Sequence, residues 1–589
     1  MASKRPSVDV VLVGMGWSAT ILARELTRSG LSVVGLERGR DRQTVPDFQA
    51  PAMHDELKYS LHYALMQDLS RETVTLRNNP SEEALPYRRF GSFLPGTDLG
   101  GAGVHWSGAC YRYVETDFRK RSHYTEKYGA KIFADDITVQ DWPLSYDDLE
   151  PYYDRFEYLC GIGGVAGNLN GTIQPGGNPF ESPRKRPFPN PPMKMGHGPA
   201  IFAKAASSLG YKPFPQPSAN VTRAYTNPEG LTLNPCVYCG FCSNYGCEHF
   251  AKSSPHSTLL PVVMKSPKFE LRFNANVIRI NLDAGGQRAT GVTYVDASGN
   301  EVEQPAEIVI LCGWVLTNAR LMLLSKIGQP YDPATGQGTV GRNFTYQTSS
   351  AVDCFFDEKT LINPFMGAGA MAMTIDEFNG DNFDHGPLGF IGGAYIQTQV
   401  VGGAPIKFHP VPRGTAKWGL EWKRAVARHY NHTMTINASG SNVAWRNNSL
   451  SLDPTYRDAN GLPLLRMTFD FHDNDIALSA FVTAKMEEIA RATGAKIIEA
   501  NPRTKPYSSV PYQSTHLSGG LAISATPRDG VVNRYCQSWD VPNLFIQGAS
   551  LFPQNVGYNP TVTVGALAYW TAKAITEQYV KTPAPLVQA

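Results

Sequence analysis

The stretch VDVVLVGMGWSATILARELTRSG, residues 8–30, decides the fold of this chain. Its first six residues are a β-branched run that predicts a buried parallel strand, and residues 20–27 have helical periodicity. Between them stands the pattern G-x-G-x-x-A, a tight turn that lets the backbone approach a pyrophosphate at a helix N-terminus. A turn that serves packing alone is the alternative interpretation. The pattern favours a dinucleotide site, and the residues expected to form it here are Gly14, Gly16, Trp17, Ser18 and Ala19.

A second strand supports the nucleotide interpretation. Residues 32–36 form another apolar β-branched run, which ends at Glu37, 21 residues after Gly16. An acidic side chain at that place is expected to accept a hydrogen bond from a ribose hydroxyl. Arg38, the next residue, is expected to line the same site.

The length and composition of the chain exclude several classes of protein. A chain of 589 residues is too long for one ordinary core, so two or more lobes are expected. The formal net charge of +2 implies neither nucleic-acid binding nor electrostatic membrane binding. No apolar run of 18 residues is present, so no transmembrane helix is expected. No apolar region precedes the first strand, so no secretory signal is expected either.

The pattern of elements predicts an α/β protein with a Rossmann-like lobe and a substrate lobe built on an antiparallel sheet. The expected lobes are residues 1–345 for nucleotide binding and 346–510 for substrate, with residues 511–589 returning to the first lobe. Ser145 is a plausible helix N-cap with Asp148 three residues later. Other expected elements are helices at 56–69, 201–209, 317–325, 475–493 and 561–580, and strands at 269–273, 277–282, 289–296, 306–311, 350–355, 434–438, 464–469 and 543–547.

The chain resembles the glucose–methanol–choline (GMC) oxidoreductase family over nearly its whole length. The resemblance rests on the N-terminal turn, on Gly100-Gly101, on Leu311-Cys312-Gly313 with 317–328, and on the block from His516 to Pro560. Within the family it is most similar to flavoprotein subunits of membrane-bound, cytochrome-linked dehydrogenases of sugars and sugar acids. It implies FAD as the cofactor, and further FAD-binding residues at Gly100, Gly101, Trp106, Val277, Gly548, Ala549, Asn559, Pro560 and Thr561.

Two histidines stand where the family places its chemistry. His105, in Gly-Gly-Ala-Gly-Val-His-Trp, matches a histidine that is bonded through its ring to the 8α-methyl group of FAD, and a histidine that packs in a core is the alternative interpretation. His516 matches the catalytic base that takes the alcohol proton as hydride leaves for the flavin. Asn559 matches the second member of the family's catalytic pair, and it could also cap the helix that begins after Pro560. The positive end of that helix is expected to stabilise the anionic reduced flavin.

Four of the nine cysteines lie within twelve residues, as Cys236-x2-Cys239-x2-Cys242-x4-Cys247. Zinc sites usually use two separated pairs of ligands, whereas a continuous run resembles an iron–sulfur ligand set. Two disulfides and a zinc site are the alternatives. The resemblance implies a [3Fe-4S] cluster held by three of the four, with Cys236, Cys242 and Cys247 favoured and Cys239 open as a third or fourth ligand. The other five cysteines are expected to be buried apolar residues.

A cluster beside a flavin implies a dehydrogenase with a protein electron acceptor, because a flavin takes two electrons together and a haem takes one at a time. The resemblance implies oxidation of a secondary alcohol of a sugar acid, D-gluconate to 2-keto-D-gluconate, with fructose, sorbitol or 2-keto-gluconate as alternative substrates. An electron-transfer module without its own substrate is the alternative of another class. A cation of the 346–510 lobe is expected to bind the carboxylate. A small accessory subunit that carries the export signal, a multihaem cytochrome c subunit and a location on the periplasmic face of the inner membrane are also implied.

Overall fold

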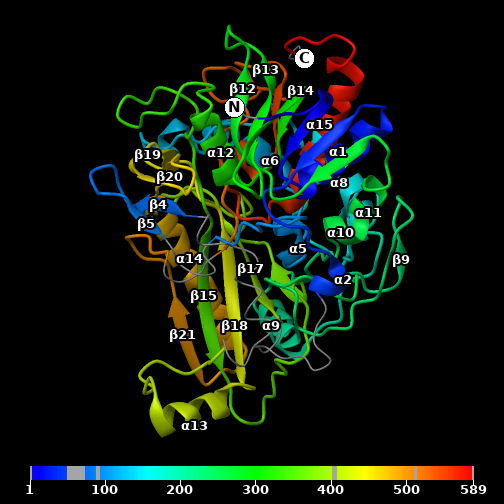
Figure 1. Ribbon diagram of the computed structural model, residues 1–589. Coiled ribbons are helices and arrows are strands. Elements are labelled where there is room, and N and C mark those ends of the chain that lie inside the picture. The colour runs from blue at the N-terminus through cyan, green and yellow to red at the C-terminus, as the bar shows by residue number, and fades with distance from the viewer. Residues whose placement is uncertain (1–2, 49–72, 88–92, 401–407, 510–513, 587–589) are drawn as a thin grey trace.

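A computed structural model describes residues 3–48, 73–87, 93–400, 408–509 and 514–586. The largest sheet contains the N-terminal strand and carries the nucleotide-binding turn (Figure 1). Its strands follow the order β11 (Phe269–Arg272), β3 (Val33–Leu36), β2 (Val8–Val13), β14 (Glu301–Leu311), β13 (Ala289–Val295) and β12 (Asn276–Leu282), with β1 (Ser3–Lys4) and β22 (Leu544–Ile546) also paired to β14. The predicted α/β class and its strands are therefore confirmed.

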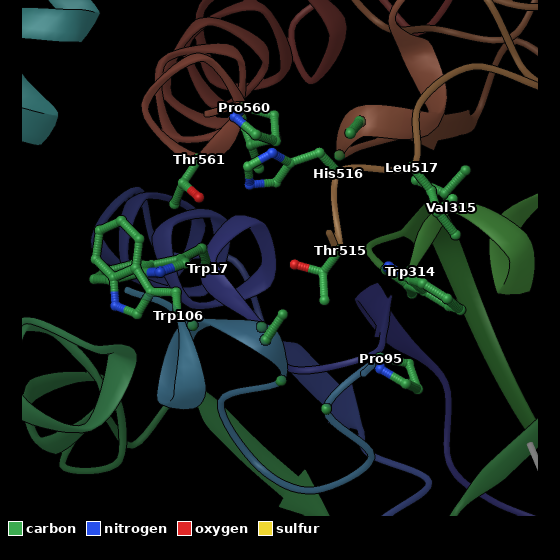
Figure 2. A pocket seen from close by; sticks show the side chains of 18 of the residues that line it. Trp17, Pro95, Trp106, Trp314, Val315, Thr515, His516, Leu517, Pro560 and Thr561 are labelled. Atoms are coloured by element: carbon green, nitrogen blue, oxygen red, sulfur yellow. The ribbon is translucent and has the colours of Figure 1, made fainter. Parts of the chain in front are cut away.

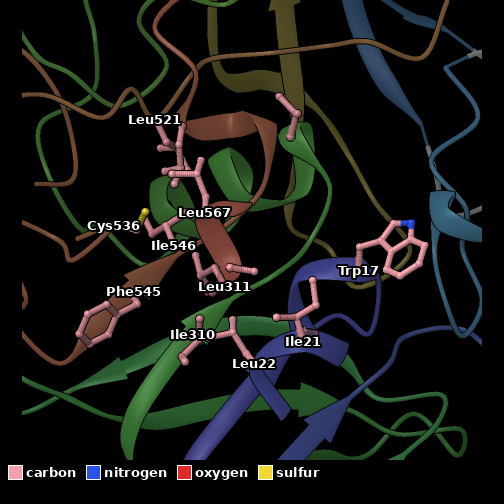
Figure 3. Close-up of a cluster of buried hydrophobic side chains, with 14 of the residues drawn as sticks. Trp17, Ile21, Leu22, Ile310, Leu311, Leu521, Cys536, Phe545, Ile546 and Leu567 are labelled. Carbon is pink, nitrogen blue, oxygen red and sulfur yellow. The ribbon is translucent and has the colours of Figure 1, made fainter. Parts of the chain in front are cut away.

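The parallel part of this sheet is packed against helix α1 (Trp17–Arg28), which in turn packs on a helix from the other end of the chain. β2, β3, β11, β14 and β22 pair in parallel, and α1 and α15 (Thr561–Ala574) pack together on one another. Figure 3 shows Ile21 and Leu22 of α1 beside Ile310 and Leu311 of β14, with Leu567 of α15 nearby. These side chains are fully buried. This hydrophobic contact joins the first 30 residues of the chain to the last 50. It therefore holds the glycine-rich turn and the C-terminal block in one lobe.

A six-stranded sheet forms the second lobe, which is antiparallel as the alternating pattern predicts. It is covered by α14 (Asp473–Ala492) and α9 (His197–Ser208), whose apolar residues bury Val352, Ile396 and Ile436 in a second core. Its strand order is β21 (Ile497–Asn501), β15 (Thr348–Phe355), β18 (Thr433–Gly440), β17 (Ala394–Gln399), β16 (Ala372–Ile375) and β8 (Phe214–Pro215).

The strand expected at 464–469 does form, but it lies in a different sheet. β20 (Pro463–Thr468) pairs with β19 (Ser449–Arg457) on one side and with β4 (Val74–Arg77) on the other, and β4 pairs with β5 (Leu85–Tyr87). This four-stranded sheet combines strands from both sides of the predicted boundary between residues 345 and 346. The second lobe also crosses that boundary, because α9 and β8 come before residue 346 and belong to the lobe. The helix expected at 56–69 falls outside the described residues.

Local capping explains where the long helix of the first lobe begins. α8 (Tyr146–Cys160) starts after Ser145, whose hydroxyl accepts a hydrogen bond from Asp148 N, while Asp148 Oδ2 accepts from Ser145 N. This reciprocal capping box confirms the predicted N-cap. The helix ends at Gly161, which adopts the left-handed conformation that closes many helices.

Shorter elements complete the described chain. They are α2 (Thr44–Asp47), α5 (Ala102–His105), α6 (Glu115–Phe118), α7 (Lys120–Tyr128), η1 (Ala130–Ile132), β6 (Asn168–Leu169), β7 (Thr172–Ile173), β9 (Tyr225–Thr226), β10 (Thr232–Leu233), α10 (Pro255–Thr258), α11 (Leu260–Val263), α12 (Val315–Leu324), α13 (Gly419–His429), η2 (Ala549–Leu551) and η3 (Ile575–Tyr579). Among the described helices, none has the length and apolar character needed to cross a membrane.

Candidate active site

A cavity of about 480 Å³ runs from the nucleotide-binding turn to the C-terminal block. At one end the turn between β2 and α1 passes so close to residues 312–313 that a Cβ on Gly14 would lie 3.2 Å from Cys312 O. The φ of Gly14 is +90°, which side-chain-bearing residues rarely adopt. Glycine at position 14 is therefore required by the close packing of this turn on residues 312–313, and the approach of a nucleotide to the turn stays a prediction.

Glu37 lines this end of the cavity with its carboxylate already engaged by the backbone. Its Oε2 accepts a hydrogen bond from Met15 N at 3.0 Å and its Oε1 accepts from Gly39 N at 2.9 Å. Burial raises the pKa of this carboxyl, and the two N–H donors oppose that shift. The carboxylate thus holds the turn in shape, and its bond to a ribose hydroxyl stays a prediction.

Most residues expected to bind the cofactor line this one cavity. They are Gly14, Gly16, Trp17, Ser18, Glu37, Arg38, Gly101, His105, Trp106, Val277, Gly548, Ala549, Asn559, Pro560 and Thr561. Ala19 and Gly100 are not among the lining residues. Ala19 is fully buried inside α1. Gly100 donates its N–H to Met15 O, and a Cβ there would lie 2.6 Å from the His256 ring, so it serves packing behind the cavity.

His105 ends the short helix α5 and is almost entirely buried in the cavity wall. Its Nε2 is buried without a hydrogen-bond partner, and burial lowers the pKa of the imidazole to about 3. A neutral ring with an unsatisfied nitrogen is an uncommon and costly feature in a core. His105 therefore fits contact with a bound group better than it fits a core histidine whose two nitrogens are both hydrogen-bonded.

His516 and Asn559, 43 residues apart in sequence, meet at the other end of the cavity. His516 Nε2 lies 3.3 Å from Asn559 Nδ2. Figure 2 shows the His516 ring beside Pro560 and Thr561, where α15 begins, and Trp17 and Trp106 across the cavity. Pro560, Thr561 and Val564 at the first turn of α15 line the cavity, so the partially positive end of that helix lies at its wall. Its effect on a reduced flavin stays a prediction.

Hydrogen-bond polarity fixes the tautomer of His516. Gln347 Nε2 donates to Gly557 O at 2.6 Å, and since a carbonyl can only accept, Gln347 Oε1 must face His516 Nδ1, 2.9 Å away. Nδ1 therefore carries the hydrogen and Nε2 keeps its lone pair. Burial lowers the pKa of His516 to about 4, so the ring is neutral at pH values well above 4.

Asn559 is oriented in the same way. Tyr395 OH, on β17, donates to Asn559 Oδ1 at 3.0 Å, which leaves the Asn559 NH2 group as a donor toward His516 Nε2. A hydroxyl oxygen placed in the cavity beside the pair, within reach of both nitrogens, would receive a hydrogen bond from Asn559 and give one to His516. This is the arrangement that proton abstraction from an alcohol requires.

The substrate-lobe wall of the cavity is made of neutral polar side chains. Gln347 and Ser349 project from β15 or its start, Tyr395 and Gln397 from β17, and Asn437 from β18. Among the described residues 346–400 and 408–509, no arginine, lysine or histidine lines the cavity. The expected carboxylate-binding cation is therefore not found in the described part of that lobe. Sequence reasoning missed these polar residues, because only the register of the sheet turns them inward.

The four clustered cysteines line a second, small cavity, and all nine cysteines of the chain are free of disulfides. Backbone and side-chain donors reach three of the sulfurs: Tyr238 N at 3.4 Å from Cys236 Sγ, Asn220 Nδ2 at 3.5 Å from Cys242 Sγ, and Lys252 N at 3.4 Å from Cys247 Sγ. Within the described chain, no three His, Cys, Asp or Glu side chains come together as ligands for a metal ion. Cys110, Cys160, Cys354 and Cys536 are buried as expected, and Cys312 is half-buried.

Lys252 joins the two cavities. Its ammonium group is buried and donates to the carbonyl oxygens of Trp106, Cys242 and Tyr245 at 2.7–2.8 Å. In the part of the chain that the structure describes, no carboxylate forms an ion pair with it. Asn244 N, between two of the cysteines, also donates to His105 O at 2.7 Å. The segment that carries His105 and the segment that carries the cysteines are thus in direct contact.

The residues present fit a flavin nucleotide. The glycine turn lines one end of the cavity, a buried His105 nitrogen without a hydrogen-bond partner lies in the cavity wall, and His516 with Asn559 closes the far end. The fold and the site together define a nucleotide-dependent oxidoreductase that acts on an alcohol group. A model of the GMC oxidoreductase family matches residues 93–349 and 445–568. The chain belongs to the GMC oxidoreductase family, whose cofactor is FAD.

Known relatives share the whole length of the chain. It is 48% identical to the gluconate 2-dehydrogenase flavoprotein of Pantoea cypripedii, covering 100% of this chain and 97% of the relative. It is 26% identical to the fructose dehydrogenase large subunit of Gluconobacter japonicus, covering 98% and 99%. Among solved structures, pyridoxine 4-oxidase from Mesorbium loti superposes with a TM-score of 0.57 at 15% identity, covering 97% and 100%, which supports the fold.

Proposed function

We propose that the chain is an FAD-dependent dehydrogenase that oxidises a secondary alcohol of a sugar acid, D-gluconate to 2-keto-D-gluconate. The observation that carries the proposal is the meeting of His516 Nε2 and Asn559 Nδ2 at the inner end of the nucleotide cavity. The similarity to a gluconate 2-dehydrogenase flavoprotein over the full chain supports the choice of substrate. Fructose, sorbitol and 2-keto-gluconate are the alternative substrates.

Bound FAD supplies the acceptor for a hydride. The chain supplies the base: His516 Nε2, kept without a hydrogen by the Nδ1–H bond to Gln347, takes the hydroxyl proton. Asn559 donates a hydrogen bond to the same oxygen and holds the alcohol in place. The base and the hydrogen-bond donor together favour loss of the hydroxyl proton. Because both side chains are uncharged before the reaction, neither repels an anionic substrate. The N-terminus of α15 adds a fixed partial positive charge beside the site.

His105 is proposed to hold the flavin covalently through a ring nitrogen. The buried, unpartnered Nε2 supports this assignment, and so does the close passage of the glycine-rich segment before it. A covalent bond would retain the cofactor when the protein is diluted or acidified. Fluorescence of the precipitated protein is the direct test.

Three of the four clustered cysteines, with Cys236, Cys242 and Cys247 favoured and Cys239 open as a third or fourth ligand, are proposed to hold an iron–sulfur cluster of the [3Fe-4S] type. The cluster would pass electrons one at a time to a cytochrome c subunit. Two observations support an anionic group in this cavity. Donors point at three of the sulfurs, as is common around cluster thiolates, and the buried Lys252 ammonium lacks a carboxylate partner among the described residues. An isolated buried charge is costly, and an anionic cluster would balance it.

The remaining partners and the location are proposed from the family resemblance given by the sequence motifs. A small accessory subunit would carry the export signal, and the assembled enzyme would lie on the periplasmic face of the inner membrane. Copurification of the chain with both subunits from a membrane extract tests this part. Recovery of the active chain alone in the cytosolic fraction would contradict it.

Anaerobic reduction of the flavin tests the substrate. D-Gluconate is expected to bleach the flavin absorbance, while fructose, sorbitol and 2-keto-gluconate are not. The His516→Ala variant is expected to slow bleaching by roughly 10²–10⁴-fold, the range for a lost general base, with FAD still bound. Bleaching by fructose but not by gluconate would show that the proposed substrate is wrong, and it would leave the proposed roles of His516 and Asn559 unchanged. No bleaching by any polyol would favour an electron-transfer module instead.

A further inference from the structure

Exposed apolar side chains gather at one end of the second lobe. The patch, here called the tip, consists of Leu361, Phe365 and Met366 with Trp418 and Leu420. Trp418 is 84% exposed, which is the highest value among the large hydrophobic residues of the described chain. Exposed large apolar side chains that gather on one part of a protein mark an interaction site more often than singly scattered ones do.

Contacts join the segment that carries Leu361, Phe365 and Met366 to the residues that follow α13. Trp418 and Leu420 stand at the start of α13, and Tyr430 just after α13 packs on Phe365 with ring centroids 5.6 Å apart. Ile362 N donates to Asn431 O at 2.7 Å, and His432 Nδ1 lies 2.7 Å from Thr360 O. In Figure 1, α13 lies at the end of the molecule opposite the N and C marks.

The outer side of α13 is cationic. The ring of Trp422 contacts His409 in the stretch that leads into α13, and no residue of the helix is buried. Lys417, Lys423 and Arg428 are exposed, and no described carboxylate pairs with them. Arg424 pairs with the one acidic residue of the helix, Glu421, at 2.9 Å. The tip therefore carries a local positive charge that the overall net charge of +2 conceals.

We propose that the tip binds the surface of an anionic lipid bilayer. A short helix that shows tryptophan and leucine beside lysine and arginine has the composition of segments that lie in the membrane–water interface. A protein partner is the less suitable occupant, because lysine is depleted in the buried parts of protein interfaces and two exposed lysines flank Trp418 and Leu420 here. The inference does not depend on the proposed substrate or cluster.

The tip is connected to the cysteine segment. Gly367 N donates to Tyr238 O at 3.1 Å, and Gly240 N donates to Gly367 O at 2.9 Å. Binding of the tip to a bilayer would therefore hold the cysteine cavity near the membrane surface. If the proposed cluster is present, a membrane-bound electron acceptor would then contact the chain beside the cysteine cavity.

Vesicle cosedimentation of the purified full-length chain tests the proposal. Vesicles of phosphatidylglycerol mixed with phosphatidylcholine, but not of phosphatidylcholine alone, are expected to bind the chain at low salt. The double variant Trp418→Glu, Leu420→Glu is expected to lose at least tenfold in the bound-to-free ratio. The double variant Leu85→Glu, Ile173→Glu, which changes two side chains exposed by 57% and 54% elsewhere, is the matched control and should bind as the unmodified chain does.

Three results would overturn the proposal. They are no binding of the unmodified chain to the anionic vesicles at low salt, equal loss of binding in both double variants, and protection of Trp418 by a copurifying subunit without vesicle binding. The last result would assign the tip to a protein contact. Equal flavin absorbance and equal thermal unfolding in the two double variants would show that any difference in binding comes from the surface and not from misfolding.

Discussion

Replacing Gln347 with glutamate should raise the pKa of His516 and move the acid side of the pH–rate profile. In the unmodified chain His516 Nδ1–H donates to a neutral oxygen at 2.9 Å, and burial lowers the pKa of the ring to about 4. A carboxylate at the same place favours the imidazolium, and an adjacent opposite charge raises a pKa by about 1–3 units. The expected value in the variant is therefore about 5–7.

The sign of the effect follows from the role of the base. His516 must be neutral to take a proton, so activity is lost as the pH falls through its pKa. At pH 5 the ring is roughly nine-tenths neutral in the unmodified chain and, with a pKa of about 6, roughly one-tenth neutral in the variant. Flavin reduction at pH 5 should therefore slow by about tenfold, while the rates at pH 8 should agree within about twofold.

Anaerobic stopped-flow reduction of the flavin between pH 4 and pH 9 measures this shift. Gln397→Glu is the matched control, because it adds the same charge to the cavity wall from a side chain that bonds Asn437 instead of His516. Gln347→Met, which removes the acceptor without adding charge, should lower the rate at every pH and leave the acid limb where it is. An acid limb that does not move in Gln347→Glu, with normal flavin content, would refute the assignment of Gln347 as the residue that orients His516.

Three further outcomes are expected. Acid-precipitated protein should keep its flavin fluorescence and His105→Ala should lose it; free flavin above the unmodified precipitate would disprove the covalent bond. Cys242→Ser should leave flavin reduction by substrate intact yet stop cytochrome reduction, measured in the reconstituted complex, so unimpaired cytochrome reduction would exclude the cysteines from the electron path. Ser145→Ala should lower the free energy of unfolding by about 0.5–2 kcal/mol in a denaturant titration because it removes the N-cap of α8, and a change below this range would mean that tertiary packing alone sets that helix end.

Local patterns made the nucleotide-binding half of the fold predictable. The β-branched run, the glycine turn and the acid at position 37 each act within a few residues, so the strand, turn and helix form where the sequence places them. The cap at Ser145 is predictable for the same reason. The resemblance supplied the His516–Asn559 pair, which no local rule identifies across 43 residues.

The pairing of β20 and the polar wall of the cavity could not be predicted, because both depend on the register between strands that lie far apart in the sequence. β20 reads as another strand of the substrate lobe, yet it pairs in parallel with β4 some 390 residues earlier. The inward positions of Gln347, Tyr395 and Gln397 depend on which residues of three strands face each other, and a shift of one residue would turn them outward. The absence of a lining cation in the described substrate lobe could not be deduced from composition, since lysine and arginine are common in that stretch of sequence.

The late position of β22 and α15 has a consequence for synthesis of the protein. β22 completes the parallel sheet beside β14, and α15 packs on α1 and α8, which emerge from the ribosome hundreds of residues earlier. The first lobe must therefore wait, with one edge of β14 unpaired and the apolar side of α1 uncovered, until the last 50 residues have been translated. Chaperone association and premature degradation should concentrate in that interval, and the active pocket cannot close around its cofactor before translation ends.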